Sequence, residues 1–351
     1  MQALPRRNAL LRATGLLAAL PSIARSAATD PVGPALQSGC TFAVAELRQG
    51  KLVNRSDGAS CRTSPDSSAV FQAASLAKPL VATLALKLVL RGKLDLERPL
   101  SDLLPDGYTH RQNLFALRES PIVDVVPSEV LKKLSTRNLL SHTSGLPNWS
   151  DRAPLRPTTE PGTRWRYSGE GYVLLQQILQ TLTGMPLNAL ASAELFEPLR
   201  MRDTAFKLTD HIAHSLVPGR SASGQIRQLR FPYEIAASSL YTSASDYARF
   251  IAATLDDQSL IDLITDAPVP VPDAPGVYWG LGWAMEQLMH HRTIWHWGNN
   301  PGFRALAMAD LTSKDAVVTL AATESGMPHA KSVVRQVLPG PHPGLELNVV
   351  Q

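Results

Sequence analysis

Ser75-Leu76-Ala77-Lys78 places a serine and a lysine three residues apart. On a helix, residues i and i+3 lie on the same face, so the two side chains would be neighbours. A serine hydroxyl is a poor nucleophile until a base removes its proton, and a lysine kept neutral by burial is such a base. The start of a helix would also place the positive end of its dipole near a developing oxyanion. An ordinary helical turn with a solvated lysine fits the same letters, so the pair alone does not establish catalysis.

A second candidate is Tyr167, in Tyr167-Ser168-Gly169. A tyrosinate near cations is able to act as a general base. Tyrosines in a core or at its rim, without any catalytic role, are more common. The sequence therefore leaves both roles open for this residue when it is considered by itself.

The third candidate is the run His296-Trp297-Gly298-Asn299, in an expected strand. A strand edge offers a backbone N–H to an oxyanion, while a neighbouring histidine binds the negative end of a substrate. Gly298 would let a substrate backbone approach closely. Single histidines and strand glycines are more often structural, so this run is also a weak indication alone.

Apolar periodicity predicts the elements that position these residues. One long apolar stretch runs from Val70 to Leu96, with Gly92 as a helix stop. Short helical pieces are expected between 101 and 165, and the tail from Gly340 is expected to be loose. Further helices are predicted at 171–182, 247–255 and 329–338. Strands are predicted at 41–56, 278–285, 293–297, 303–310 and 316–322.

This order of elements predicts an α+β fold. Strands near both chain ends would form one antiparallel sheet flanked by helices, and residues from about 101 to 235 would form an inserted, mostly helical lobe. Sites commonly lie in a cleft between two such parts. We therefore expect the candidate residues to meet between the sheet and the helical lobe, within one catalytic domain over 29–351.

The composition is that of a folded chain without a general preference for anionic partners. Of the 351 residues, 44% are hydrophobic and 18% are charged. The formal net charge is +4, but residues 1–28 hold four arginines and no acid, which leaves the remainder at zero. The charge balance therefore gives no reason to expect nucleic acid as a partner.

Residues 1–28 have the pattern of an export signal. Arg6-Arg7 precedes a short apolar run, and small residues close the segment at Ala24, Ser26 and Ala28. The paired arginines suggest the twin-arginine route, although a Sec signal also fits, and we expect a periplasmic protein. An amphipathic N-terminal helix of the mature fold is the alternative. No later run reaches ~18 apolar residues, so no membrane span is predicted.

Metal or cofactor chemistry has no support in the sequence. Cys40 and Cys61 flank the expected hairpin, whose open end a disulfide would tie, or they are two free buried thiols. Neither has a His or Cys neighbour at metal-ligand spacing. His211 and His214 stand three apart, but no third ligand is in sight. We expect neither a metal nor an organic cofactor.

Together and in this order, the three candidates resemble the active-site set of serine β-lactamases, DD-peptidases and related esterases, which is Ser-x-x-Lys, Tyr-x-Asn and Lys/His-x-Gly. The segments at 136–147, 161–163 and 240–246 match the same family. The resemblance covers about residues 40–338 and is strongest for the class C β-lactamase branch, which includes family VIII-type esterases. It implies a β-lactamase/transpeptidase-like fold.

The resemblance also implies roles for the residues. Ser75 would be acylated by an ester, amide or peptide carbonyl, and Lys78 and Tyr167 would share the proton transfers. Backbone N–H groups of Ser75 and Asn299 would bind the oxyanion, with His296 and Gly298 beside the substrate. Water would then release the acyl group. His142 lies in a family signature segment and is interpreted as structural.

The chain departs from the family pattern at two places. Gly169 stands where the family has an asparagine, and Trp297 replaces a small hydroxylic residue. Both changes remove polar groups that would hold a β-lactam or peptide, so we expect an esterase or amidase that acts on less polar substrates. A DD-peptidase or β-lactamase is the alternative, followed by a non-catalytic binding protein. A Ser-His-Asp hydrolase is disfavoured, because the chain has no Gly-x-Ser-x-Gly.

Overall fold

The structure is a computed structural model, and it describes residues 42–53, 69–289 and 291–350. The expected export signal at 1–28, and both Cys40 and Cys61, lie outside the described residues.

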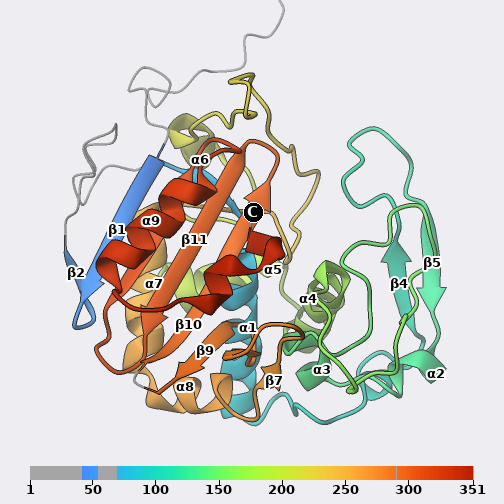
Figure 1. The fold of residues 1–351 in the computed structure, drawn as a ribbon. Coiled ribbons are helices and arrows are strands. Elements are labelled where there is room, and N and C mark those ends of the chain that lie inside the picture. The colour runs from blue at the N-terminus through green and yellow to red at the C-terminus, as the bar shows by residue number, and fades with distance from the viewer. Residues whose placement is uncertain (1–41, 54–68, 290, 351) are drawn as a thin grey trace, which may run out of the picture. The chain divides into compact units, whose positions relative to one another are not determined.

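An eight-stranded antiparallel sheet dominates the described part of the chain, with the order β2-β1-β12-β11-β10-β9-β8-β7 (Figure 1). Strands from near the beginning of the chain thus pair with strands from its last quarter, as the sequence predicts. The strands are β1 (Phe42–Arg48), β2 (Lys51–Val53), β7 (Val269–Pro270), β8 (Val277–Trp279), β9 (Ala284–Leu288), β10 (His291–Asn300), β11 (Phe303–Asp310) and β12 (Ala316–Ala321).

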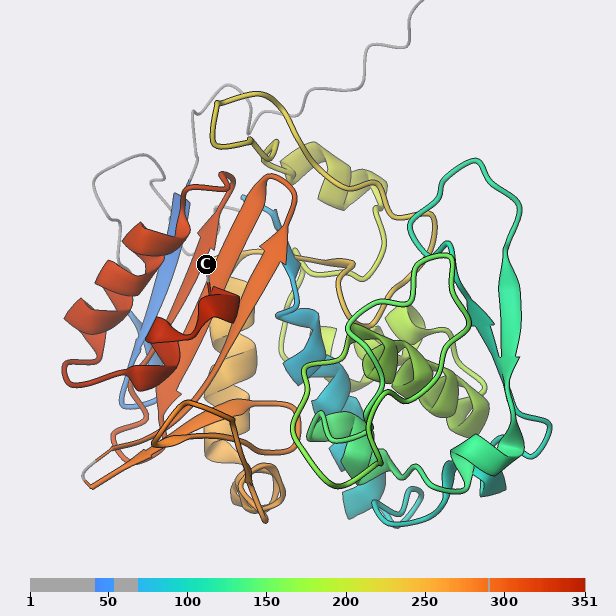
Figure 2. The ribbon, with the colours of Figure 1, turned by 45° about the vertical axis from the view of Figure 1, so that its right-hand side comes forward.

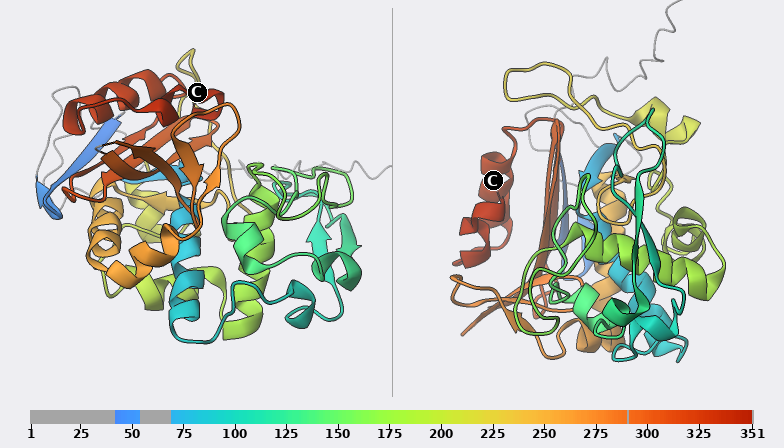
Figure 3. Two further views of the ribbon diagram at one scale, coloured as in Figure 1. Left: turned by 60° about the horizontal axis from the view of Figure 1, so that its bottom comes forward. Right: turned by 90° about the vertical axis from the view of Figure 1, so that its right-hand side faces the viewer.

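The two faces of this sheet belong to two apolar clusters, because side chains alternate along a strand. In β11, Ala305 and Ala307 join one cluster, whereas Leu306 and Met308 join the other. Seen edge-on, the sheet carries α9 and the C-terminal turns on one face and the remaining helices on the other (Figure 3). Helix α9 spans Met327–Val337. Helices on the other face include α1 (Ala77–Leu90), α7 (Ala244–Asp256) and α8 (Gln258–Ile264).

The middle of the chain is less helical than predicted, because short helices alternate with long irregular segments. Helix α1 stands between it and the sheet (Figure 2). Helix α4 packs against both α1 and α3. The elements of this part are β3 (Phe71–Ala74), β4 (Tyr108–Arg111), β5 (Val123–Val126), α2 (Ser128–Leu131), α3 (Thr136–Leu140), α4 (Gly169–Thr183), α5 (Leu187–Ala191) with a π-helical turn at Ser192–Phe196, α6 (Asp210–Ser215) and β6 (Leu240–Thr242). Strand β3 pairs with β6, and β4 pairs with β5, in two small antiparallel ladders.

Local sequence explains where the central helix α4 begins and ends. The Ser168 hydroxyl caps its first turn by accepting the Gly171 N–H at 2.8 Å. Gly184 ends the helix in a left-handed conformation, with φ of +69°. The position of this helix matters for function because Tyr167 directly precedes the cap.

The stretch from Val70 to Leu96 is not one helix as its apolar pattern suggested. Its first residues form β3, which pairs with β6, and α1 begins only at Ala77. The helix ends at Leu90, followed by Gly92 at φ +66°. A short apolar run fits a buried strand as well as a helix, and here pairing with a distant strand decides.

Two further expectations were wrong. The strand predicted at 278–285 is two strands, because a turn at 280–283 separates β8 from β9. The tail after Gly340 is not loose: it forms 3-10 turns at Pro343–Glu346 and Asn348–Val350, and Leu345 and Val350 are fully buried. These apolar side chains pack in the same cluster as Trp295 and Trp297 of β10, which accounts for the ordered path.

Candidate active site

Ser75 lies in the turn between β3 and α1. The preceding Ala74 has φ of +51°, an uncommon conformation for a residue with a Cβ. This bend redirects the chain, so that Ser75 precedes the helix by two residues and is partly exposed, while the following residues are buried. Such strain concentrates at functional sites.

Lys78 is fully buried, and its Nζ lies 3.0 Å from Ser75 Oγ. The same Nζ donates to the backbone carbonyl of Ala237 at 2.8 Å. Burial lowers the pKa of Lys78 to about 7, so that a large fraction of this amine is neutral near neutral pH. With one N–H held by Ala237, the nitrogen lone pair is able to accept the proton of Ser75.

Tyr167 completes this group. Its ring centroid lies 4.9 Å from Lys78 Nζ. Within the described part of the chain its buried hydroxyl has no hydrogen-bond partner, although it lies against Ser75. Burial raises the pKa of Tyr167, and Ser75 offsets only part of that rise. Tyr167 is therefore a neutral phenol at rest, able to relay a proton rather than to hold a negative charge.

His296 lies on β10 close to the same group. Its Nδ1 is 2.8 Å from the carbonyl oxygen of Trp297, and its ring centroid is 6.1 Å from that of Tyr167. Burial, together with the nearby Lys78 charge, lowers the pKa of His296 to about 3. The imidazole is therefore neutral near pH 7 and brings no positive charge to a substrate carboxylate.

The two residues after Trp297 have different surroundings. A Cβ at Gly298 would lie 2.2 Å from the carbonyl oxygen of Ala73, so this glycine lets β3 approach β10 closely. Asn299 is exposed and pairs with Arg304, next to the Asn300–Phe303 pair that closes the hairpin. In the alternating antiparallel pattern, its backbone N–H points away from β11.

A cleft of about 640 Å³ opens over Ser75 and Tyr167. None of the described residues that line it carries a charged side chain. Several come from separate loops that no motif or fixed spacing links to one another in the sequence. The lining residues are Ser75, Phe115, Asn148, Trp149, Tyr167, Leu229, Ser238, Trp297, Asn299, Asn300, Pro301 and Asn348.

Neighbouring side chains fill the space beside Gly169. A Cβ there would lie 2.7 Å from the Asn148 carbonyl oxygen and 2.9 Å from the Trp149 ring. The side-chain oxygen of Asn148 accepts the Gly169 N–H at 3.0 Å. The missing asparagine of the family motif therefore leaves no gap, since Asn148 and Trp149 occupy this wall of the cleft.

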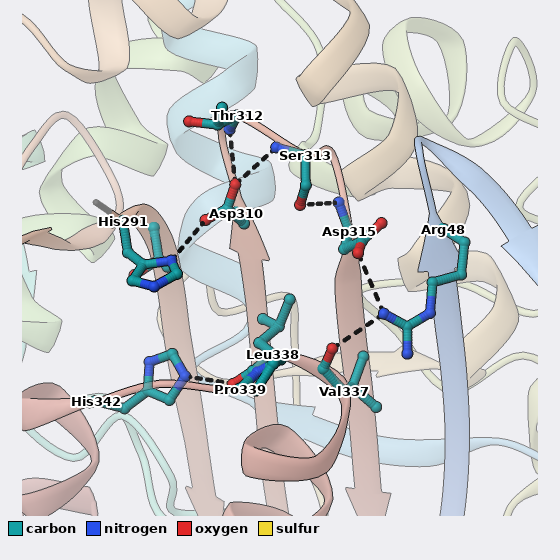
Figure 4. Close-up of a pocket in the computed structure, with 11 residues that line it drawn as sticks. Arg48, His291, Asp310, Thr312, Ser313, Asp315, Val337, Leu338, Pro339 and His342 are labelled. Atoms are coloured by element: carbon teal, nitrogen blue, oxygen red, sulfur yellow. Dashed lines mark hydrogen bonds and ion pairs between the residues drawn. The ribbon is translucent and has the colours of Figure 1, made fainter.

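A second pocket, of about 380 Å³, is lined by polar residues that bind one another (Figure 4). Arg48 donates to Asp315 at 3.1 Å, and His291 lies 3.7 Å from Asp310. His342 is held by the backbone carbonyl of Leu338. These groups pair among themselves, and none of the described lining residues repeats the serine–lysine pair of the cleft at Ser75.

The described residues hold neither a cluster of metal ligands nor a helix suited to cross a membrane. No three His, Cys, Asp or Glu side chains gather to hold a metal ion there. His211, exposed on α6, lies 2.8 Å from Asp203. No helix among these residues combines the length and apolar character that crossing a membrane requires.

Comparison with known proteins shows the family to which the chain belongs. The family model described as Beta-lactamase matches residues 40–338, which is most of the chain. The chain belongs to the beta-lactamase family. The family and the fold predicted from the sequence are thus confirmed.

Individual relatives of this family member are distant. Esterase EstB of Burkholderia gladioli is 31% identical over 166 residues, covering 39% of this chain and 38% of that protein. A class C beta-lactamase structure is 19% identical, with a TM-score of 0.68 and coverage of 86% and 92%. D-amino acid amidase from Ochrobactrum anthropi is 23% identical, with a TM-score of 0.64 and coverage of 85% and 92%. Alignments with the curated relatives span 33% to 63% of those proteins' lengths.

Proposed function

We propose that this beta-lactamase family member is a serine hydrolase that forms an acyl-enzyme on Ser75 and acts on uncharged esters or amides. One observation carries the proposal. Lys78 is fully buried with its Nζ 3.0 Å from Ser75 Oγ, and burial lowers its pKa to about 7. A structural lysine has no need of this burial, whereas a base for the serine does.

The proposed reaction has two halves. Ser75 Oγ attacks the substrate carbonyl carbon while its proton passes to neutral Lys78, with Tyr167 sharing the transfer. The oxyanion that forms accepts hydrogen bonds from the backbone N–H groups of Ser75 and Asn299. The bond to the leaving group breaks as that group receives the proton. Water then attacks the acyl ester and gives a proton to Lys78. Lys78 returns that proton to Ser75 Oγ as the acid leaves.

The walls of the cleft support an uncharged substrate. The described lining residues are aromatic, aliphatic, hydroxyl and amide side chains, and none is charged. His296, with a pKa lowered to about 3, adds no cation nearby. A substrate carboxylate would thus lose its hydration without gaining a cation among the described lining residues. The names of an esterase and a D-amino acid amidase among the relatives agree with ester and amide substrates.

The test compares the wild type with Ser75→Ala on p-nitrophenyl butyrate, with a chromogenic cephalosporin alongside. We expect ester hydrolysis that disappears in the variant, and slow or no opening of the cephalosporin. Faster opening of the cephalosporin than of the ester would favour a β-lactamase instead. A stable penicilloyl adduct on Ser75 without ester turnover would favour a DD-peptidase. Hydrolysis that survives in Ser75→Ala would reject the serine mechanism.

We further propose that residues 1–28 direct export to the periplasm. The support is the sequence pattern of Arg6-Arg7, a short apolar run and small residues near Ala28. Replacing both arginines by lysine should block export if the twin-arginine route is used, and cell fractionation followed by an ester assay measures it. Full export of the lysine variant would point to the Sec route.

A further inference from the structure

His142 follows α3 in the signature segment at 136–147, where a purely structural role was expected. The residue is completely buried, and its φ is +57°. Histidine is among the residues that tolerate this left-handed conformation better than most. The unusual backbone at a buried position suggests that the orientation of this residue serves its neighbours.

Two hydrogen bonds join His142 to the chain on either side of Tyr167. Its backbone carbonyl accepts the N–H of Arg166 at 2.7 Å. Its imidazole Nδ1 accepts the N–H of Ser168 at 3.1 Å. One residue thus binds the backbone N–H groups of Arg166 and Ser168, the residues directly before and directly after Tyr167.

The imidazole also contacts the tyrosine ring itself. Ring centroids of His142 and Tyr167 lie 4.5 Å apart, and Trp297 lies 5.0 Å from Tyr167. The ring centroids of Trp279 and His142 lie 4.7 Å apart. Packing of this kind limits rotation of the tyrosine, whose hydroxyl lies against Ser75 without a hydrogen bond of its own among the described residues.

The hydrogen bond to Ser168 requires an unprotonated Nδ1, since a backbone N–H only donates. Burial is the main factor that lowers the pKa of His142, and Lys78 and His296 lower it further when they are protonated. The aromatic neighbours Tyr167 and Tyr172 carry no charge that would reverse this effect. His142 therefore remains neutral and keeps its acceptor at ordinary pH.

We propose that His142 is a positioning residue for Tyr167, holding its backbone on both sides and its ring in contact so that the hydroxyl stays against Ser75. The inference rests on the proposed function, because Tyr167 needs this position only if it shares proton transfer with Lys78. His142 itself does not touch the reacting atoms.

The experiment measures kcat and KM for p-nitrophenyl butyrate in wild type, His142→Ala and His142→Asn, each with and without Tyr167→Phe. Asparagine keeps an acceptor near the Nδ1 position and tolerates positive φ. We expect His142→Ala to lower kcat roughly 10- to 100-fold, with KM changed by less than about threefold. His142→Asn should recover most of that loss. Thermal unfolding of each variant checks that all are folded at the assay temperature.

The Tyr167→Phe background separates positioning from general damage. If His142 acts through Tyr167, His142→Ala should cost less than about twofold further once the hydroxyl is gone. The same fold loss in both backgrounds, or wild-type kcat in His142→Ala, would overturn the proposal. An inactive Ser75→Ala beside a fully active His142→Ala would reject the positioning role alone, whereas an active Ser75→Ala would reject the proposed function and this role with it.

Discussion

Burial alone sets the chemistry of Lys78. Burial lowers its pKa to about 7, and no described carboxylate contributes an opposing effect. The groups that face it are the Ser75 hydroxyl, the rings of Tyr167 and Tyr172, and the neutral histidines. A charged lysine in these surroundings has only the Ala237 carbonyl and the serine for solvation, which is why the neutral form becomes accessible.

Ester hydrolysis should therefore rise with pH through about 7. The active form of Lys78 is the deprotonated amine, so kcat/KM should increase as pH passes its pKa of about 7 and then level off. Lys78→Ala should lower kcat/KM by roughly 10²- to 10⁴-fold and remove this rise. Exposed Lys93 provides the control, and Lys93→Ala should match the wild type. A pH profile unchanged in Lys78→Ala would contradict this assignment.

Restoring the family asparagine at position 169 should damage the protein. Its Cβ would lie 2.7 Å from the Asn148 carbonyl oxygen and 2.9 Å from the Trp149 ring. We expect Gly169→Asn to lower the free energy of unfolding by about 1–3 kcal/mol, because overpacking strains buried contacts. It should not create penicillin hydrolysis. Urea unfolding and a cephalosporin assay test this, and a stable variant that opens cephalosporins would show that the wall adapts.

At this scale the sequence revealed residues whose spacing has a meaning. The pair of Ser75 and Lys78 could be predicted because residues three apart lie on the same face of a helix. Asn148, Trp149 and Asn348 line the same cleft, but they belong to separate loops and turns. Only the folded chain brings them together, so no local pattern predicts them.

Among the elements, the C-terminal turns show how a buried ion pair holds a segment. Glu286 of β9 accepts from His342 Nδ1 at 2.8 Å, Thr293 Oγ1 at 2.9 Å and the Gly344 N–H at 3.0 Å. His342 Nε2 lies 2.7 Å from the Leu338 carbonyl oxygen. An ionised Glu286 and the Leu338 carbonyl both accept from this ring, which favours the imidazolium form of His342 and agrees with its raised pKa.

Loss of His342 should destabilise the protein in a pH-dependent way. Burial opposes protonation, but bonds to Glu286 and to the Leu338 carbonyl outweigh it and raise the pKa of His342. A raised pKa gives stability that is fully present below about 6.5 and is lost as pH rises through the folded value. We expect His342→Ala to lower the free energy of unfolding by about 3–5 kcal/mol at pH 6, with a smaller difference at higher pH. Urea unfolding across pH measures it, and a constant difference would exclude the linkage.

Helices and strands were predicted correctly where an apolar pattern continued over many residues. They were missed where pairing with another strand determines the structure. Helix α4 and strands β11 and β12 have clear patterns and lie close to the expected ranges. Strand β3 was hidden in an apolar run, and the β4–β5 hairpin was missed within a region expected to hold short helices. Strand β3 owes its structure to β6, far away in the chain, and β4 pairs with β5 across the long connection 112–122, which has no strong turn signal.

For the molecule as a whole, the sheet could be predicted because strand patterns near both ends of the chain needed partners. The uncharged lining of the cleft could not be predicted in the same way. The lining depends on which side chains of several loops point into the cleft. The charge of the chain after residue 28 is balanced as well. After the arginines of residues 1–28, equal numbers of acidic and basic residues remain. Attraction of charged substrates over long distances is therefore not expected.

This combination predicts strong discrimination against an acyl group that carries a carboxylate. We expect kcat/KM for p-nitrophenyl butyrate to exceed that for p-nitrophenyl hemisuccinate at least about tenfold, because a carboxylate in the cleft loses water without gaining a cation. Raising the salt concentration should leave this ratio nearly unchanged if the barrier is desolvation at short range. A ratio that falls steeply with salt would instead identify repulsion by the surface. A preference for the hemisuccinate would mean that a cation reaches the acyl group. It would favour the DD-peptidase or β-lactamase reaction over the proposed hydrolysis of uncharged esters or amides.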